Sequence, residues 1–200
     1  SKIFADGNEL NPIVFTSNNP IGQRAEGDWG GLVLLGSAIN NQPGGVANIE
    51  GITPTNDTQH GGNNDNDNSG IMRYVSIRHG GAILSVGSEI NGLTLASVGR
   101  GTTIENIEIV SCADDNIEIF GGTVNLKYCT TLFGNDDMFD YDLGWKGKCQ
   151  FFFGMKNTAT GASPDNDNGI EADSDDNASN VAFRSHPVLY NFTIIGNGKN

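Results

Sequence analysis

Residues 104–122 read IENIEIVSCADDNIEIFGG, and residues 126–144 read LKYCTTLFGNDDMFDYDLG. When the two stretches are aligned at an offset of 22 residues, Asp114, Asp115 and Glu118 fall on acids, and Ile117 and Ile119 fall on aromatic residues. Ile107 then matches Cys129, and Asp115 matches Asp137. A repeat of this length that holds short strands suits one rung of a parallel β-helix, in which each strand pairs with its counterpart one rung above. The repeat therefore predicts an all-β solenoid with rungs of about 22 residues.

Further copies of the strand pattern extend this prediction along the chain. RYVSIRHGG (residues 73–81) and LYNFTIIGN (residues 189–197) fit the same template, with longer offsets that require inserted loops. The copy that follows residue 144 is expected to start at Lys148, which places Phe151 and Phe153 at inward positions. An antiparallel sandwich also has many short strands, but it does not explain why like residues align at a fixed offset.

Two long polar segments, residues 52–70 and 157–180, are rich in Asn and Asp and interrupt the strand pattern. We expect them to loop out of the stack, because the same type of strand resumes after each one. The sequence thus predicts one β-helix domain over residues 1–200. The chain opens and closes on rung strands with no recognisable cap, so we expect a segment of a longer solenoid.

The charge balance narrows the range of partners. The chain has 24 Asp and Glu against 11 Lys and Arg, a formal net charge of -13. A phosphate backbone is repelled by such a surface, so nucleic acid is not an expected partner. No stretch approaches the roughly 20 apolar residues of a membrane helix, so membrane insertion is not expected either. The three cysteines are predicted to be free thiols.

The repeat stacks carboxylates on consecutive rungs. The pairs are Asp114 with Asp136, Asp115 with Asp137, and Glu118 with Asp140. Like charges directly opposed in a sheet are destabilising, and one member of such a pair raises its pKa unless something compensates. Three remedies are open: Lys146 and Lys148 on the following rung, amides of the turns, or a bound Ca²⁺.

The polar segments contain a second set of candidate Ca²⁺ ligands. Residues 65–70 read DNDNSG, which resembles the first half of a calcium loop but lacks its later Glu. Residues 165–176 read DNDNGIEADSDD, a density of hard oxygen ligands that suits Ca²⁺ better than Zn²⁺. A solvated acidic loop is the alternative. The candidate ligands are Asp65, Asp67, Asp165, Asp167, Glu171, Asp173 and Asp175.

A catalytic role is the second hypothesis for the stacked acids, because two carboxylates that flank a glycosidic bond can cleave it. In this hypothesis Arg78, Lys146 or Lys148 shuttles protons, and His79 is a candidate base. His79 precedes two glycines at the end of a predicted strand, which is more typical of a turn residue. The candidate acids are Asp114, Asp115, Asp136, Asp137 and Asp140.

Aromatic residues near turns are candidates for an external sugar platform, since sugars pack on exposed rings. Trp145, Tyr141 and Phe152 are predicted to form it. Phe139 is expected in the core together with Phe151 and Phe153.

Several longer strings resemble one known family. They are NPIVFTS, GDWGGLVLLG, DNSGIMRYVSIRHGG, EINGLTLASVGRGTTIENIEIVS, ADDNIEIFGGTVNLKY and DDMFDYDLGWKGKCQF. They are similar to secreted right-handed parallel β-helix proteins of Bacteroidetes-type and marine bacteria, which often carry a cell-surface sorting tail. That family has no settled biochemical activity. The resemblance implies a right-handed parallel β-helix and an extracellular or cell-surface location.

These observations favour an extracellular structural or adhesive module, acidic and stiffened by Ca²⁺. It is expected to stack end to end with copies of itself or to continue into further rungs, and extracellular glycans are candidate partners. The alternative is a carbohydrate-active protein, either a polysaccharide lyase or glycoside hydrolase or a carbohydrate-binding module. The sequence favours a non-enzymatic role without deciding it, because no nucleophile signature is present.

Overall fold

The computed structural model describes residues 1–85, 88–157, 168–175 and 182–196. Two parallel sheets, joined rung by rung through turns, form the body of the molecule. Their strands pair only in parallel, and each pairs with the equivalent strand of the rungs above and below. The fold is therefore the predicted all-β parallel β-helix.

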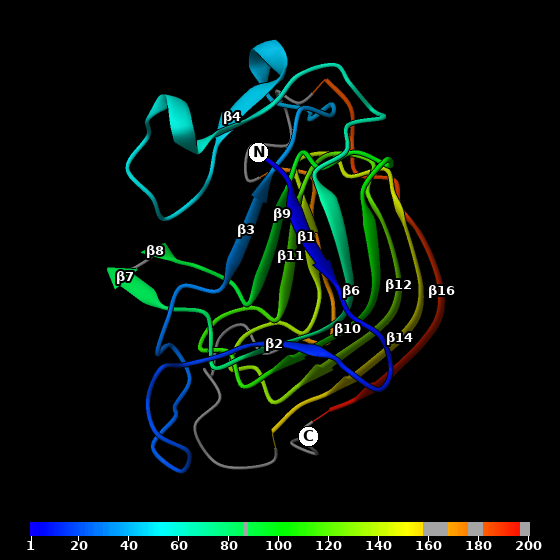
Figure 1. Ribbon diagram of the computed structural model, residues 1–200. Coiled ribbons are helices and arrows are strands. Elements are labelled where there is room, and N and C mark those ends of the chain that lie inside the picture. The colour runs from blue at the N-terminus through cyan, green and yellow to red at the C-terminus, as the bar shows by residue number, and fades with distance from the viewer. Residues whose placement is uncertain (86–87, 158–167, 176–181, 197–200) are drawn as a thin grey trace.

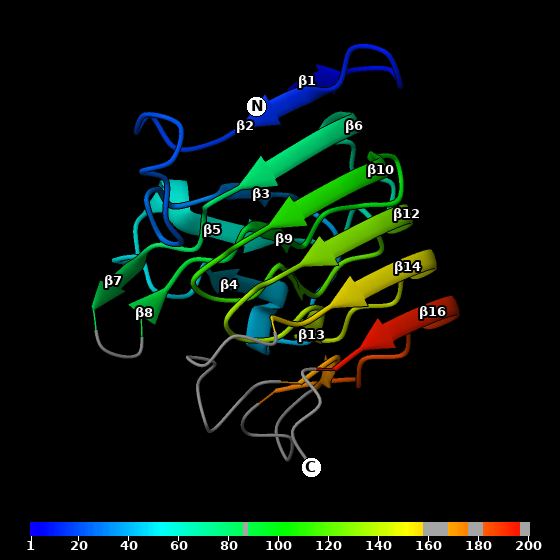
Figure 2. The same ribbon diagram turned by 90° about the horizontal axis from the view of Figure 1, so that it is seen from below.

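One sheet, called here the long sheet, runs in the order β1-β6-β10-β12-β14-β16, with β2 also paired to β6. Figure 2 shows β6, β10, β12, β14 and β16 side by side, with β1 and β2 at one end of the row and β16 at the other. The strands are β1 (Ile3–Asp6), β2 (Ile13–Phe15), β6 (Gly70–Arg78), β10 (Thr103–Val110), β12 (Asn125–Leu132), β14 (Lys148–Met155) and β16 (Val188–Ile195).

The other sheet, called the short sheet, has the order β15-β13-β11-β9-β3. Its strands are β3 (Leu32–Leu35), β9 (Leu93–Ala96), β11 (Ile117–Phe120), β13 (Asp140–Asp142) and β15 (Glu171–Ala172). The strands of this sheet thus have two to four residues, whereas β6, β10, β12, β14 and β16 of the long sheet have eight or nine. Glycines with positive φ, such as Gly121 (φ 67°) and Gly122 (φ 83°), turn the chain from β11 towards β12.

The rung length is not constant, and this corrects part of the prediction. Ile107 pairs with Cys129 at an offset of 22 residues, whereas Cys129 pairs with Phe152 at an offset of 23. The extra residue lies in the turn between β13 and β14, where residues 143–147 replace the four residues 121–124 of the preceding rung. A one-residue shift exchanges the two faces of a strand. The prediction that Phe151 and Phe153 point inward is therefore wrong: Phe152 is buried and Phe151 is 40% exposed.

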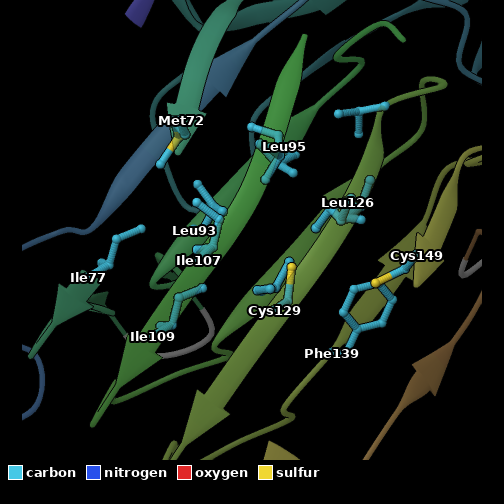
Figure 3. Packing of buried hydrophobic residues seen from close by; sticks show 14 of the residues in the cluster. Met72, Ile77, Leu93, Leu95, Ile107, Ile109, Leu126, Cys129, Phe139 and Cys149 are labelled. Atoms are coloured by element: carbon cyan, nitrogen blue, oxygen red, sulfur yellow. The ribbon is translucent and has the colours of Figure 1, made fainter. Parts of the chain in front are cut away.

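The core lies between the two sheets as columns of stacked apolar side chains. Figure 3 shows Ile107, Leu126 and Cys129 of the long sheet in this interior, with Leu93 and Leu95 of the short sheet. Towards β16 the column becomes aromatic, with Phe139, Trp145, Phe152 and Phe192 in ring contact. All three cysteines are buried free thiols, as predicted.

Two hairpins lie outside the stack. β4 (Val46–Asn48) pairs antiparallel with β5 (Gln59–Gly61), and β7 (Ile83–Ser85) pairs with β8 (Ser88–Glu89) in a hairpin that projects from the body (Figure 1). One 3-10 turn, Pro43–Gly45, precedes β4, and another, Asn56–Thr58, lies in the connection between β4 and β5. Residues 52–70, expected to be a loop, thus include a 3-10 turn and β5. Ile49 and Ile52 pack with Phe120 and Ala96 on the outer face of the short sheet.

Within the described residues, no helix is long and apolar enough to cross a membrane.

Candidate functional site

A column of polar side chains runs across the outer face of the short sheet. Thr94, Glu118, Asp140 and Glu171 occupy equivalent positions on β9, β11, β13 and β15. They alternate with residues that point into the core, such as Ile117 and Ile119, so they face outward. The register prediction for Glu118 over Asp140 is confirmed. Three carboxylates therefore stand on three consecutive rungs.

Further acids come from the turns that precede β11 and β13. The backbone N–H of Asp137 donates to Asp115 Oδ1 at 2.8 Å, so turn amides satisfy part of this stack. Among the described residues, two groups of three carboxylates have oxygen atoms that all lie within 4.8 Å of one another. The groups are Asp114, Asp115 and Asp136, and Asp115, Glu118 and Asp140.

These side chains line a cavity of about 170 Å³ on the outer face of the short sheet, closed on one side by Ile49 and Glu50 after β4. Burial raises the pKa of Asp115 and of Glu118 well above their ordinary values, and the neighbouring carboxylates add to both shifts. Burial also raises the pKa of Asp140 to about 6. A hydrogen bond with Asp137 raises the pKa of Glu171 to about 8. We name this feature the acid cavity.

The outer face of the long sheet has a different character. Each of its longer strands contains one residue with positive φ that is skipped in the pairing register, and these residues form a column across the rungs. They are Tyr74 (φ 50°), Asn106 (φ 54°), Tyr128 (φ 57°), Phe151 (φ 62°) and Asn191 (φ 57°). A left-handed residue inside a strand bends it, as in a β-bulge. The bends create a groove of about 610 Å³ that contains all five.

Two rings dominate this groove. Tyr128 and Phe151 are stacked with ring centroids 5.0 Å apart and planes inclined by 5°. They are 46% and 40% exposed. The Nζ of Lys127 lies 4.9 Å from the Tyr128 ring centroid and 5.9 Å from that of Phe151, which is within cation–π range. We name this feature the aromatic groove.

The sugar platform predicted from the sequence is wrong for Trp145 and Phe152, which are buried. Trp145 is fully buried and its Nε1 donates to the Val124 carbonyl at 3.1 Å, while Phe152 is 2% exposed. Tyr141 is half-buried and packs against Phe139 and Trp145. The exposed rings that line the aromatic groove are Tyr128 and Phe151 instead.

The sequence contains a signal for the aromatic groove in the spacing of its inward residues. In a regular strand inward residues are two positions apart, yet here an interval of three recurs in every longer strand. The intervals are Met72 to Val75, Ile104 to Ile107, Leu126 to Cys129, Cys149 to Phe152 and Leu189 to Phe192. The interval of three marks the bend. The residue directly before the second inward residue of each pair has positive φ and lines the groove.

The candidate Ca²⁺ ligands of the polar segments separate in space. Asp67 accepts hydrogen bonds from the hydroxyls of Ser37 and Ser69, both at 3.0 Å, and Asp65 pairs with Arg100 at 3.3 Å. The carboxylates of Asp67 and Asp65 thus join separate segments of the chain through hydrogen bonds and an ion pair. Glu171 belongs to the acid cavity.

Of the remaining ligand candidates, Asp173 and Asp175 are in the part of the chain that the structure describes, and neither lines the acid cavity. Asp175 accepts a hydrogen bond from the Gln42 side chain, and Asp173 lies on the turn after β15. Asp165 and Asp167 lie outside the described residues.

The candidate proton shuttles lie away from the acid cavity. Lys146 Nζ lies 3.6 Å from the Phe183 ring centroid, and Lys148 begins β14 in the long sheet. Arg78 pairs with Glu108 at 3.1 Å. His79 has a φ of 63° and its backbone N–H donates to the Val110 carbonyl, as expected of a turn residue.

The structure thus defines a class of protein: a parallel β-helix with an acid cavity on one sheet and an aromatic groove on the other. The profile of the family described as "Pectate-lyase like beta helix domain" matches residues 1–200. The chain belongs to this family. Neither the curated proteins nor the solved structures give a match.

Proposed function

We propose that the chain is an adhesive, carbohydrate-binding β-helix module that holds a neutral polysaccharide in the aromatic groove. The observation that carries the proposal is the exposed stack of Tyr128 and Phe151 in the groove on the outer face of the long sheet. The family description supports a carbohydrate ligand. An adhesive role in turn places the module outside the cell or at its surface.

The chemistry of the groove suits a repeating sugar chain. Aromatic rings pack on the apolar faces of sugars, while amide and hydroxyl groups bond their hydroxyls. Asn106 and Asn191 stand beside the two rings, and Thr130 and Thr193 follow the bend. These groups recur at the strand spacing of about 4.8 Å along the solenoid. A linear glycan that runs across the strands can therefore meet similar contacts on successive rungs.

The negative net charge of the chain favours neutral glycans over anionic ones as ligands. A formal net charge of -13 disfavours the approach of polyuronates and other polyanions. Lys127 is close to the rings, but Glu108 lies in the same groove. We therefore expect a neutral polysaccharide.

The groove supports binding better than hydrolysis by paired carboxylates. Glu108 is the one carboxylate among the described residues that line it, and its side chain is held by Arg78 and by the Ser76 hydroxyl. A glycosidase of the usual type needs two carboxyl groups on either side of the scissile bond. The other stacked acids are on the outer face of the opposite sheet.

Retention on insoluble cellulose, chitin and β-mannan, with polygalacturonate as an anionic comparison, tests the proposal. We expect at least one neutral glycan to be retained, and Tyr128→Ala together with Phe151→Ala to weaken retention at least tenfold. Tyr190→Ala is the matched control, since Tyr190 is 61% exposed on β16 but does not line the groove. Unchanged retention in the double variant would contradict the proposal. Release of reducing ends or unsaturated products would favour the enzymatic alternative.

A second candidate, an end-to-end structural role, is favoured by β16. In the described residues this eight-residue strand pairs with β14 alone, and Val188, Tyr190 and Ile195 on it are exposed. Unpaired strand edges recruit other strands, from another copy or from further rungs. Sedimentation velocity over a concentration series tests self-association. Assembly that Val188→Lys with Ile195→Lys abolishes supports stacking, and a monomer at every concentration contradicts it.

A further inference from the structure

The acid cavity is a separate feature that glycan binding does not use. It lies on the outer face of the short sheet, where the residues after β4 cover β9, β11 and β13. Its carboxylates come from different rungs, so any group that binds them also ties those rungs together. The lining carboxylates are Glu50, Asp114, Asp115, Glu118, Asp136, Asp140 and Glu171.

The charged side chains that line this cavity are all acidic. Among the described residues that line it there is no Lys, Arg or His. Lys156 donates to the backbone carbonyl of Asp136, but it is not a lining residue. Glu118 and Asp140 hydrogen-bond to each other, which requires a proton on one of them when nothing else is bound. The cavity therefore holds negative charge that a cation can neutralise.

Two buried oxygen atoms in the cavity have no hydrogen-bond partner. One is Oδ1 of Asp140, a residue only 8% exposed, and the other is Oδ1 of Asn91, which is 4% exposed. The amide nitrogen of Asn91 donates to Glu118 and to the Thr94 hydroxyl, which fixes the orientation of its side chain. Buried acceptors without a donor are costly, because each has lost its water. These atoms are independent evidence for a ligand that accepts electron pairs.

We propose that the acid cavity binds a divalent cation, Ca²⁺, through the carboxylates of Asp115, Glu118 and Asp140 and through Oδ1 of Asn91. Oxygen atoms of the three carboxylates already lie within 4.8 Å of one another. Ca²⁺ takes six to eight oxygen ligands in flexible geometry and accepts both carboxylate and amide oxygens. Bound there, it neutralises the stacked acids and ties together the rungs of β9, β11 and β13, from which its ligands come.

The test measures Ca²⁺ binding and Ca²⁺-dependent stability of the whole chain. Protein depleted of metal with EGTA is titrated with CaCl₂ and, separately, with MgCl₂ by calorimetry, and its Tm is recorded with and without each ion. We expect saturable Ca²⁺ binding and a higher Tm in Ca²⁺. Glu118→Gln and Asp140→Asn should each weaken binding at least tenfold and remove the rise in Tm. Glu9→Gln, the same substitution at an exposed position outside the cavity, should leave both unchanged.

The metal-free proteins separate lost binding from lost folding. Glu118→Gln removes one of the repelling acids and keeps the hydrogen-bonding shape, so its metal-free Tm should equal or exceed that of the wild type. Wild-type protein without saturable Ca²⁺ binding would overturn the proposal, as would Ca²⁺ affinity unchanged in both cavity variants. Binding of Mg²⁺ with Ca²⁺ silent would overturn the choice of ion. Glycan retention is a separate measurement, so either proposal can fail alone.

Discussion

Tyr128 and Phe151 stack with their ring centroids 5.0 Å apart, although 23 residues rather than 22 separate them. The two residues are equivalent positions on β12 and β14, each at the left-handed bend of its strand. The one-residue insertion in the turn before β14 brings Phe151 to the surface and Phe152 into the core. This register has direct consequences for stability.

Phe152→Ala and Phe151→Ala should differ in their cost, although the residues are adjacent and identical. Phe152 is buried against Phe139 and Phe192, so its loss should lower the free energy of unfolding by about 3–5 kcal/mol. Phe151 loses a half-exposed stack on Tyr128, which is worth about 0.5–1.5 kcal/mol. Urea unfolding of the two variants measures both values.

Equal losses, or a larger loss for Phe151→Ala, would mean that the constant 22-residue register is correct after all. Tyr128→Ala combined with Phe151→Ala completes a double-mutant cycle. It should show that the costs of the two single variants are not additive, since the rings touch each other.

The fold could be predicted because the sequence repeat itself determines which strands pair. Ile107 and Cys129, or Glu118 and Asp140, recur at the offset that stacks them, and parallel pairing follows. The inward positions of β14 could not be found by extending that offset. A turn can gain a residue without changing the hydrophobic pattern of the strand that follows, because alternation fixes the faces only relative to each other.

The candidate sites show the same limit. The acid stack was visible in the sequence because acids aligned with acids. Glu171 belongs to the stack because β15 pairs with β13. The repeat could not predict this pairing, because inserted residues separate the two strands in the sequence. The aromatic groove depended on the left-handed bends, and Tyr and Phe are not residues for which a positive φ is expected.

Gly31→Ala should destabilise the protein more than Gly44→Ala, although both glycines have a φ close to 80°. Both substitutions place a side chain in the left-handed region, at a cost of roughly 1–2 kcal/mol. At Gly31 a Cβ would also lie 2.1 Å from the Asn91 carbonyl oxygen and 2.7 Å from that of Gly92, whereas at Gly44 nothing lies within 4 Å.

Since backbone rather than a flexible side chain obstructs Gly31, we expect an additional loss of about 1–3 kcal/mol there. Thermal and urea unfolding of the two variants compare the losses. Similar losses in both variants would show that β3 does not approach β9 as closely as the structure indicates.

His60 should make stability depend on pH because its side chain, on β5 of the β4–β5 hairpin, is buried against Ser97 and Phe120. The side chain is 3% exposed, with Nδ1 2.8 Å from the Ser97 hydroxyl and the ring centroid 6.4 Å from that of Phe120. Burial lowers the pKa of His60 to about 4 from an ordinary value of 6.5. Below pH 6.5 the unfolded chain therefore takes up a proton that the folded chain refuses, so stability falls as the pH drops towards 4.

The contribution of the buried neutral ring to the free energy of unfolding is present above pH 6.5. Roughly 2 kcal/mol of that free energy should be lost between pH 7.5 and pH 5. Other groups titrate in the same range, so the comparison is between wild type and His60→Gln, each unfolded in urea at both pH values. The wild type should lose more stability than the variant over this interval. Identical losses of stability in the two proteins would show that the folded state does not disfavour protonated His60. The hairpin would then not pack against Ser97 and Phe120 as described.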